Sequence, residues 1–110
     1  MVELSAAQAN MLAAARTGHL ATADAAGVPH VIPVCYAFDG RSIYSVLDRK
    51  PKRAGLTRLR RVRNIQANPE VALVVDHYEE DWSKLRYILL TGRAELLLVA
   101  EERAGAVRLL

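Results

Sequence analysis

The sequence predicts an α+β domain whose main element is an antiparallel β-sheet closed into a small barrel. Three observations predict this class. Asp39-Gly40 is a hairpin signal between two apolar runs, strand-like segments follow one another with short turns between them, and a helical apolar period is confined to one internal segment. A chain of 110 residues is long enough for one core. We therefore expect a single domain over residues 1–110.

The first half of the chain predicts one helix and three strands. Ser5 and Gln8 have the spacing of a capping box, so a helix is expected from there to Thr17, with Gly18 as its left-handed C-terminal stop. Ala25-Ala26-Gly27 is expected to turn the chain between the first two strands. The expected strands are 19–24, 28–38 and 42–47.

The second half predicts a helix, two strands and a terminal helix. Leu56, Leu59, Val62 and Ile65 recur every three residues, which predicts a helix over 56–66 that ends before Asn68-Pro69. The remaining expectations are strands over 71–78 and 85–98, an acidic loop over 79–83, and a helix over 101–109.

The strand expected over 28–38 is apolar on both faces, although Pro29 and Pro33 each remove a backbone donor. An edge of this kind is usually covered, and a flat aromatic ligand or a partner subunit would cover it. The high apolar content also favours a homodimer. Cys35 lies in mid-strand and is expected to be a buried structural thiol, and a single cysteine is typical of the reducing cytoplasm.

Eight of the 15 Lys and Arg residues lie between Arg49 and Arg63, where there is no acidic residue. The rest of the chain has seven basic and 12 acidic residues, so the basic character is local. A concentrated positive charge between a strand and a helix favours a compact anion such as phosphate. Nucleic acid is not favoured as a partner, because the remainder is acidic and only 5% of the residues are aromatic.

Other kinds of site find little support in the sequence. The histidines His19, His30 and His77 show no metal-ligand spacing with one another or with Cys35. Ligation of haem iron by a single histidine, His30 or His77, stays open as an alternative. No Ser, His and Asp arrangement suggests a nucleophile, and no catalytic residue is assigned. No Gly-rich phosphate loop, signal peptide or apolar run long enough to cross a membrane is recognised.

Five segments, in this order, resemble the pyridoxamine 5′-phosphate oxidase-like split β-barrel family. The resemblance is closest to its actinobacterial branch that depends on the deazaflavin coenzyme F420. The segments are Leu20-Ala-Thr-Ala-Asp-Ala-Ala-Gly-Val-Pro-His-Val-Ile-Pro-Val34, Ile43-Tyr-Ser-Val46, Lys50-Pro-Lys-Arg53, Asn68-Pro-Glu-Val-Ala-Leu73 and Asp76-His-Tyr-Glu-Glu-Asp-Trp82.

The resemblance implies a six-stranded split β-barrel with flanking helices, and a homodimer with two cofactor sites at its interface. It also implies a closing strand beyond the last helix, which we do not find in this chain. The residues expected to line the cofactor ring are His30, Val31, Ile32, Pro33, Ser45, Val46 and Leu47. The expected phosphate ligands are Lys50, Lys52 and Arg53, with Arg58 near the cofactor or its acidic tail, and the expected substrate contacts are Tyr36, Tyr78 and Trp82. Trp82 falls in a loop that, in the family, can reach the partner's site.

The resulting hypothesis is a cytoplasmic, F420-dependent oxidoreductase that transfers a hydride between the deazaflavin and a small unsaturated or oxidised substrate. F420 carries a phosphodiester and glutamate carboxylates, which an extended basic segment complements. Two alternatives stay open. One is an FMN-binding oxidase or flavin reductase of the same fold, and the other is a non-catalytic protein that carries the cofactor.

Overall fold

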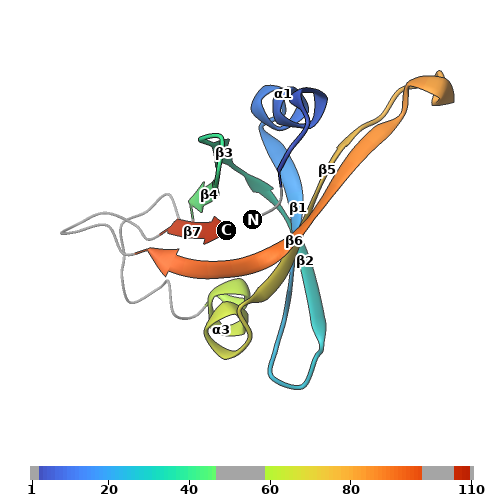
Figure 1. The fold of residues 1–110 in the computed structure, drawn as a ribbon. Coiled ribbons are helices and arrows are strands. Elements are labelled where there is room, and N and C mark those ends of the chain that lie inside the picture. The colour runs from blue at the N-terminus through green and yellow to red at the C-terminus, as the bar shows by residue number, and fades with distance from the viewer. Residues whose placement is uncertain (1–2, 47–58, 98–105, 110) are drawn as a thin grey trace.

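The computed structural model describes residues 3–46, 59–97 and 106–109. Seven strands form one sheet in the order β2-β1-β5-β6-β7-β4-β3, and every neighbouring pair is antiparallel. The expected class, a mainly antiparallel sheet with flanking helices, is confirmed (Figure 1). The strands are β1 Thr17–Ala23, β2 Pro29–Cys35, β3 Ala37–Phe38, β4 Ile43–Val46, β5 Glu70–His77, β6 Arg86–Leu97 and β7 Ala106–Leu109; the helices are α1 Ala6–Ala14, α3 Arg60–Ala67 and the 3-10 helix η1 Trp82–Lys84.

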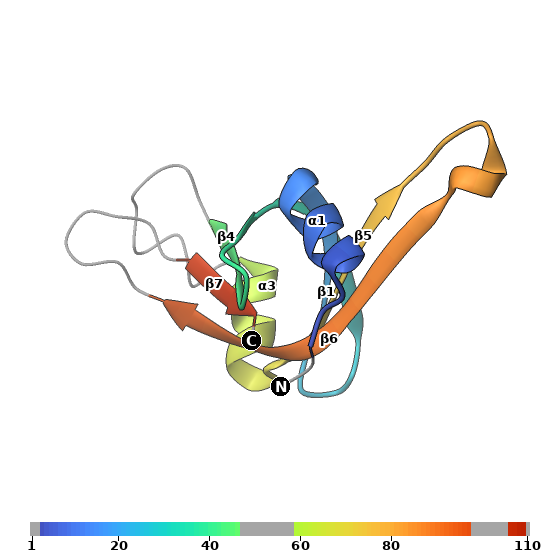
Figure 2. The same ribbon diagram turned by 45° about the horizontal axis from the view of Figure 1, so that its top comes forward.

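The barrel closes at Tyr36. This residue lies between β2 and β3, which are the first and last strands in the order of the sheet. The backbone N–H of Tyr36 donates to the carbonyl oxygen of Arg16 at 3.0 Å, which extends the β1–β2 pairing by one residue. From Ala37 onward the chain pairs with β4 instead. The single strand expected over 28–38 is therefore two strands with different partners, and the covalent link between them curls the sheet back on itself (Figure 2).

The core fills the space between the inner face of this sheet and the two helices. Strand alternation points every second residue of β1 and β5 inward, as in Leu20, Leu73 and Val75. Helix α1 contributes Leu12, and α3 contributes Val62 and Ile65. The apolar stripe expected on the second helix is confirmed within α3, whereas residues 56–58 lie outside the described part of the chain.

The first helix begins as expected and ends earlier. The capping box is present, since the N–H of Ser5 donates to Oε1 of Gln8 at 2.8 Å and the N–H of Gln8 donates to Oγ of Ser5 at 3.1 Å. The expected stop at Gly18 is wrong, because α1 ends at Ala14 and Gly18 lies in β1. A Cβ atom on Gly18 would lie 2.9 Å from the carbonyl oxygen of Val74, so a close approach between strands requires the glycine.

The hairpin expected at Asp39-Gly40 is confirmed between β3 and β4. Gly40 has a φ of 98°, and the carboxylate of Asp39 accepts the backbone N–H groups of Ser42 at 2.7 Å and Arg41 at 2.8 Å. These two hydrogen bonds, that from Ser42 first, lower the pKa of Asp39. The turn therefore fixes the position at which β4 begins.

The helix expected over 101–109 is wrong for its described part, because Ala106–Leu109 is strand β7. This strand lies between β4 and β6 and pairs with both. An Ala- and Glu-containing stretch has helical propensity, but pairing on two sides satisfies every backbone group of a strand and overrides that propensity.

Strands β5 and β6 extend beyond the rest of the sheet. Their pairing runs from Glu70↔Arg93 to His77↔Arg86, whereas β1 pairs only with residues 72–74 of β5. Residues 76–87 therefore form a two-stranded projection, here called the arm, with η1 at its tip (Figures 1 and 2).

We predict that Tyr36→Phe lowers the free energy of unfolding by about 1 kcal/mol, because the Tyr36 hydroxyl donates to the carbonyl oxygen of Leu12 at 2.8 Å. Burial raises the pKa of Tyr36 above 10.0, so the folded state holds this proton more tightly than the unfolded chain. The stability difference should therefore shrink as the pH rises past about 10. Urea unfolding at several pH values measures it.

The matched control is Tyr87→Phe, which removes a hydroxyl from a side chain that is 70% exposed and should change stability by less than about 0.5 kcal/mol. Equal effects at positions 36 and 87 would contradict the structural role of the Tyr36 hydroxyl.

Candidate functional site

The four residues of β2 that were expected to line a cofactor ring divide between two faces of the sheet. His30 and Ile32 face the barrel interior and are partly buried, since they pair with the inward residues Thr22 and Leu20. Val31 and Pro33 are exposed on the opposite face. This division follows from the period of two in a strand. One planar ligand inside the barrel can therefore contact only the first pair through side chains.

A polar group occupies the interior at the His30 end of the barrel. Asn64, on α3, donates from Nδ2 to Oγ1 of Thr22 at 2.9 Å, and both residues are 3% exposed. In the described part of the chain, Nδ1 of His30 is the buried side-chain polar atom that has no hydrogen-bond partner. A buried nitrogen without a partner favours a ligand that supplies one.

Strand β4, which holds a second set of expected residues, lies near β2. Cα atoms of β2 and β4 come within 8 Å of one another, and Ser45 is buried at 7% exposure. Val46 is the last residue of β4, from which the chain enters the basic segment. The expected contacts Leu47, Lys50, Lys52, Arg53 and Arg58 lie outside the described residues.

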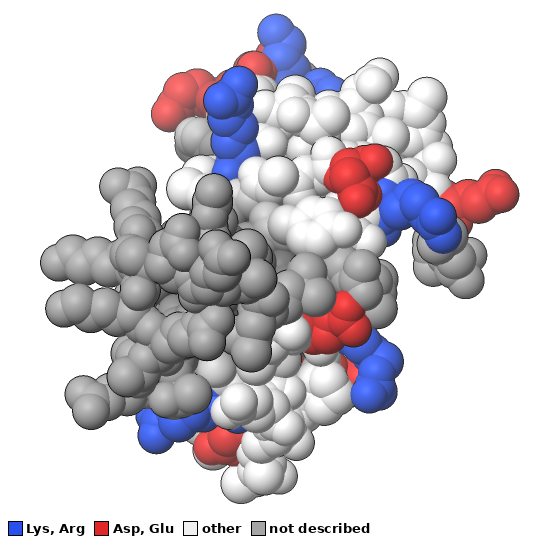
Figure 3. All heavy atoms as spheres, turned by 90° about the vertical axis from the view of Figure 1, so that its left-hand side faces the viewer, with Lys and Arg blue, Asp and Glu red and all other residues white. Residues whose placement is uncertain are grey.

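Of the basic segment Arg49–Arg63, the structure describes the part from residue 59 onward, whose arginines lie on α3. A guanidinium nitrogen of Arg60 lies 4.0 Å from a carboxylate oxygen of Asp24, in the β1–β2 turn. Arg63 is exposed. Figure 3 shows described Lys and Arg side chains interspersed with Asp and Glu on the side that it displays. A strong local positive charge therefore depends on the residues of the 49–58 stretch.

The three expected aromatic contacts are not brought together within one chain. Tyr36 is partly buried and uses its hydroxyl to hold α1. Tyr78 and Trp82 lie on the arm and are 63% and 73% exposed. The arm points away from the barrel that contains His30 (Figure 1). A site that used both sets would need the arm of another chain.

The tip of the arm is held by its own hydrogen bonds. The Asp81 carboxylate accepts from the hydroxyl of Ser83 at 2.7 Å and from its backbone N–H at 3.1 Å, and these bonds lower the pKa of Asp81. Nε2 of His77 lies 3.0 Å from Oε1 of Glu79. These local contacts place Trp82 at the outer end of the molecule without burying it.

Cys35 is exposed, which corrects the expectation of a buried thiol. It pairs with Thr17, so strand alternation places it on the outer side of β2 with Val31 and Pro33. The alternation of a strand predicts that Cys35, Val31 and Pro33 share one face. When both faces of a strand are apolar, alternation does not say which face is covered.

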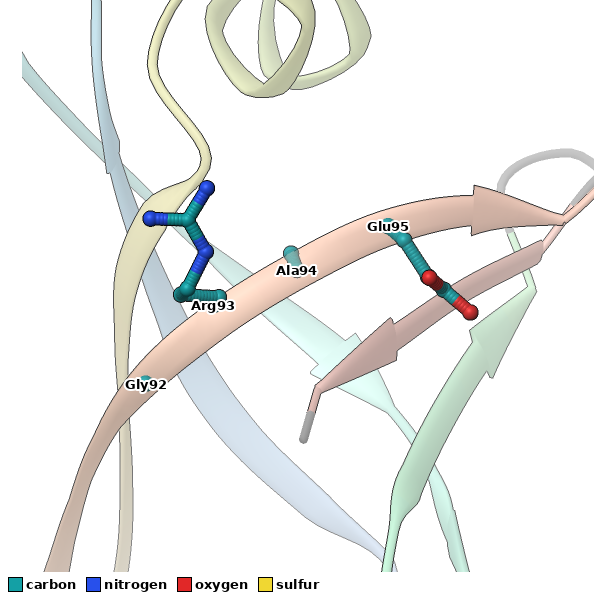
Figure 4. A pocket seen from close by; sticks show the side chains of 4 residues that line it. All are labelled: Gly92, Arg93, Ala94 and Glu95. Carbon is teal, nitrogen blue, oxygen red and sulfur yellow. The ribbon is translucent and has the colours of Figure 1, made fainter.

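A separate hollow of about 360 Å³ lies along β6 and is lined by Gly92, Arg93, Ala94 and Glu95 (Figure 4). Its Arg93 guanidinium donates to a carboxylate oxygen of Glu70 at 3.2 Å. None of the four residues was expected in a site. A hollow lined by consecutive residues of one strand and open to solvent offers few groups that converge on a ligand.

Neither a metal centre nor a membrane span is found among the residues that the structure describes. They contain no group of three or more His, Cys, Asp and Glu side chains arranged to hold a metal ion. No described helix is long and apolar enough to cross a membrane.

The family follows from the sequence comparison. Residues 4–110 match the family model described as Pyridoxamine 5'-phosphate oxidase. The chain belongs to this family. The resemblance stated on the five sequence segments is confirmed at that level. No curated protein matches the chain.

Solved structures share the oxidase-family fold. A conserved hypothetical protein from Mycobacterium tuberculosis is 21% identical with a TM-score of 0.78, over 100% of this chain and 81% of its own. The heme storage protein HutZ from Vibrio cholerae is 14% identical with a TM-score of 0.71, over 98% and 89% of the two chains. An FAD-binding protein from Mesorhizobium loti is 29% identical with a TM-score of 0.64, over 86% of this chain and 62% of its own.

The sequence reasoning missed the Thr22–Asn64 pair, which shapes the interior beside His30. Asn64 lies directly before Ile65, and neither its type nor its spacing distinguishes it from the exposed polar residues of the same helix. Only the contact between α3 and β1, far apart in sequence, reveals the pair.

We predict that Asn64→Ala lowers the free energy of unfolding by about 2–3 kcal/mol, because it leaves the Thr22 hydroxyl unpaired and opens a small cavity. Gln66→Ala, at an exposed position of α3, is the control and should be nearly neutral. Thermal or urea unfolding measures both. A double-mutant cycle with Thr22→Val should give a coupling of about 0.5–1.5 kcal/mol, and additive effects would contradict the pair.

Proposed function

We propose that the protein binds a flavin-type cofactor, preferably F420, and acts as an oxidoreductase on a small unsaturated or oxidised substrate. The observation that carries the proposal is one of position. Strand β4 runs directly into the basic segment, and it lies beside the strand whose inner side bears the unpartnered His30 nitrogen. A planar cofactor with an anionic tail needs these two features close together.

Membership of the oxidase family supports a flavin-type cofactor. The FAD-binding protein from Mesorhizobium loti and another from Mycobacterium smegmatis have similar folds. The preference for F420 rests on the basic segment, because it continues past the proposed phosphate ligands to Arg58, which would lie near the acidic tail. FMN, with one phosphate group, would use only the first part of the segment.

The proposed roles follow the placement of each residue. His30 and Ile32, from the inner side of β2, and Ser45 would contact the ring system. Lys50, Lys52 and Arg53 would bind the phosphate, and Arg58 would lie near the acidic tail. In a homodimer, the arm of the partner would supply Tyr78 and Trp82 to the substrate side.

The bound cofactor supplies the hydride chemistry. The chain's own part is to orient the ring, exclude water from its inner side and hold the anionic tail. Such a role needs no proton-transfer residue, which agrees with a sequence that has no nucleophile-and-base arrangement.

We predict that replacing both Lys52 and Arg53 with Ala weakens F420 binding by about 2–4 kcal/mol, because two charge-assisted hydrogen bonds would be lost. Titration followed by cofactor fluorescence measures this, with FMN and FAD as competing ligands. Arg60→Ala is the control and should have little effect, since Arg60 already lies beside Asp24. An unchanged titration curve for the double variant would remove the phosphate role.

The same titrations separate the alternatives. Tighter binding of FMN than of F420 would favour an FMN oxidase or flavin reductase. Cofactor binding without oxidation of the reduced cofactor by any acceptor would favour a carrier.

A further inference from the structure

Strand β2 is the first strand in the order of the sheet, so it is paired along one edge. Its partner along that edge is β1, over the whole length of β2. None of the described strands pairs with the opposite edge, here called the free edge. An unpaired strand edge offers backbone N–H and C=O groups to other molecules.

The register with β1 shows which backbone groups of β2 reach the free edge. In an antiparallel pair, residues that exchange two hydrogen bonds alternate with residues that exchange none. The N–H of Tyr36 donates to the carbonyl oxygen of Arg16 at 3.0 Å, just beyond one end of the ladder. The N–H of Asp24 donates to the carbonyl oxygen of Val28 at 3.1 Å, just beyond the other end. Even-numbered residues of β2 therefore direct their backbone groups toward β1, and odd-numbered residues direct theirs to the free edge.

Two prolines isolate a single donor in the middle of the free edge. The odd-numbered residues of β2 are Pro29, Val31, Pro33 and Cys35, and proline has no N–H. Cys35 lies beside Tyr36, where the chain leaves β1. Val31 lies between the two prolines, and its N–H and C=O point the same way. Among the described residues, neither group takes part in a backbone hydrogen bond outside the strand ladders.

A second peptide strand is poorly matched to this edge. An added strand forms hydrogen bonds with every second residue of the edge that it joins. The missing donors at Pro29 and Pro33 would leave carbonyl groups of that strand unpaired on both sides of Val31. Proline on an edge strand is one of the ways in which proteins prevent such pairing. The free edge therefore suits a small ligand that needs one donor and one acceptor side by side.

The ligand chemistry that fits Val31 is a cyclic amide. In a trans peptide the N–H and the C=O of one amide point in opposite directions. An amide inside a small ring is held cis, so its N–H and C=O lie on the same side and can meet the C=O and N–H of one edge residue. The pyrimidinedione edge of flavins and deazaflavins is a cyclic imide, in which the N3–H lies between two carbonyl groups.

We propose that the backbone of Val31 binds the cyclic imide edge of the cofactor ring. The ring N3–H donates to the carbonyl oxygen of Val31, and a ring carbonyl oxygen accepts from the N–H of Val31. This inference rests on the proposed function, and adds the class of ligand edge and the atoms that recognise it. FMN and F420 share this edge, so Val31 does not select between them.

The neighbours of Val31 agree with this placement. His30 and Ile32, assigned above to the ring, flank Val31 and face the barrel interior. Strand β4, which holds Ser45, has Cα atoms within 8 Å of β2. The Val31 side chain is 59% exposed on the opposite face, so it is the backbone of this residue that the ligand uses.

The donor half of the contact is tested on the wild-type protein with modified ligands. F420 and FMN are each titrated as they are and methylated at N3, with fluorescence as the measurement. Methylation removes the ring N–H, so we expect binding at least about tenfold weaker for both cofactors. Equal affinities of a cofactor and its methylated form would overturn the proposal.

The acceptor half is tested with Val31→Pro, which removes the N–H. The fold should tolerate it, because β1 does not use this N–H and prolines already occupy positions 29 and 33. Unmodified F420 and FMN should bind about tenfold more weakly. Val31→Ala keeps the N–H and is the matched control, which should bind as the wild type does. Equal effects of the two variants would overturn the proposal.

Combining the two changes distinguishes a direct contact from a steric effect of the methyl group. In Val31→Pro, methylation at N3 should weaken binding less than it does in the wild type, because one change already disrupts the paired contact. Additive effects would contradict the contact. If Val31→Pro does not fold, the methylated ligands on the wild-type protein decide the question.

Amide hydrogen exchange of the ligand-free protein keeps this test separate from that of the proposed function. The N–H of Val31 should exchange faster than those of Ile32 and Val34, which face β1. Equal protection of all three would overturn the inference while leaving cofactor binding intact. Fast exchange at Val31 in a protein that binds neither F420 nor FMN would instead reject the proposed function, and with it this role of Val31.

Discussion

The whole barrel depends on the change of strand partner at Tyr36. On one side of this residue the chain is paired with β1, and on the other side with β4, so a single residue joins the two ends of a seven-stranded order. Two hydrogen bonds fix it, one from its backbone to Arg16 and one from its hydroxyl to Leu12. Leu12 lies in α1 and Arg16 lies between α1 and β1, so the N-terminal helix and the closure of the sheet form one structural unit. This closure also brings β2 toward β4.

Much of the fold can be predicted from local chemistry. The capping box at Ser5, the Asp39-Gly40 hairpin and the strand expected over 71–78 each depend on neighbours in sequence, and each is confirmed. The errors arise where distant contacts decide the outcome. Gly18 resembles a helix stop until Val74 is placed beside it, and 106–109 resembles a helix until β4 and β6 are present on its two sides.

The candidate site was harder to predict for a related reason. Family resemblance drew attention to β2 and β4, but it does not show that the members of a run such as His30 to Pro33 face opposite ways. The Thr22–Asn64 pair and the exposure of Cys35 depend on which side of a doubly apolar strand is covered. Composition cannot supply that information, because both sides of β2 have similar residues.

Strand β2 has a further consequence for how this chain can change over time. Because its odd and even positions serve opposite surfaces, point substitutions can alter one surface and spare the other. Loss or gain of one residue between the β1–β2 turn and Tyr36 would instead exchange the two sets together, turning His30 and Ile32 outward and Val31 and Pro33 inward. We therefore expect natural variants of this segment to differ in residue type and to keep its length.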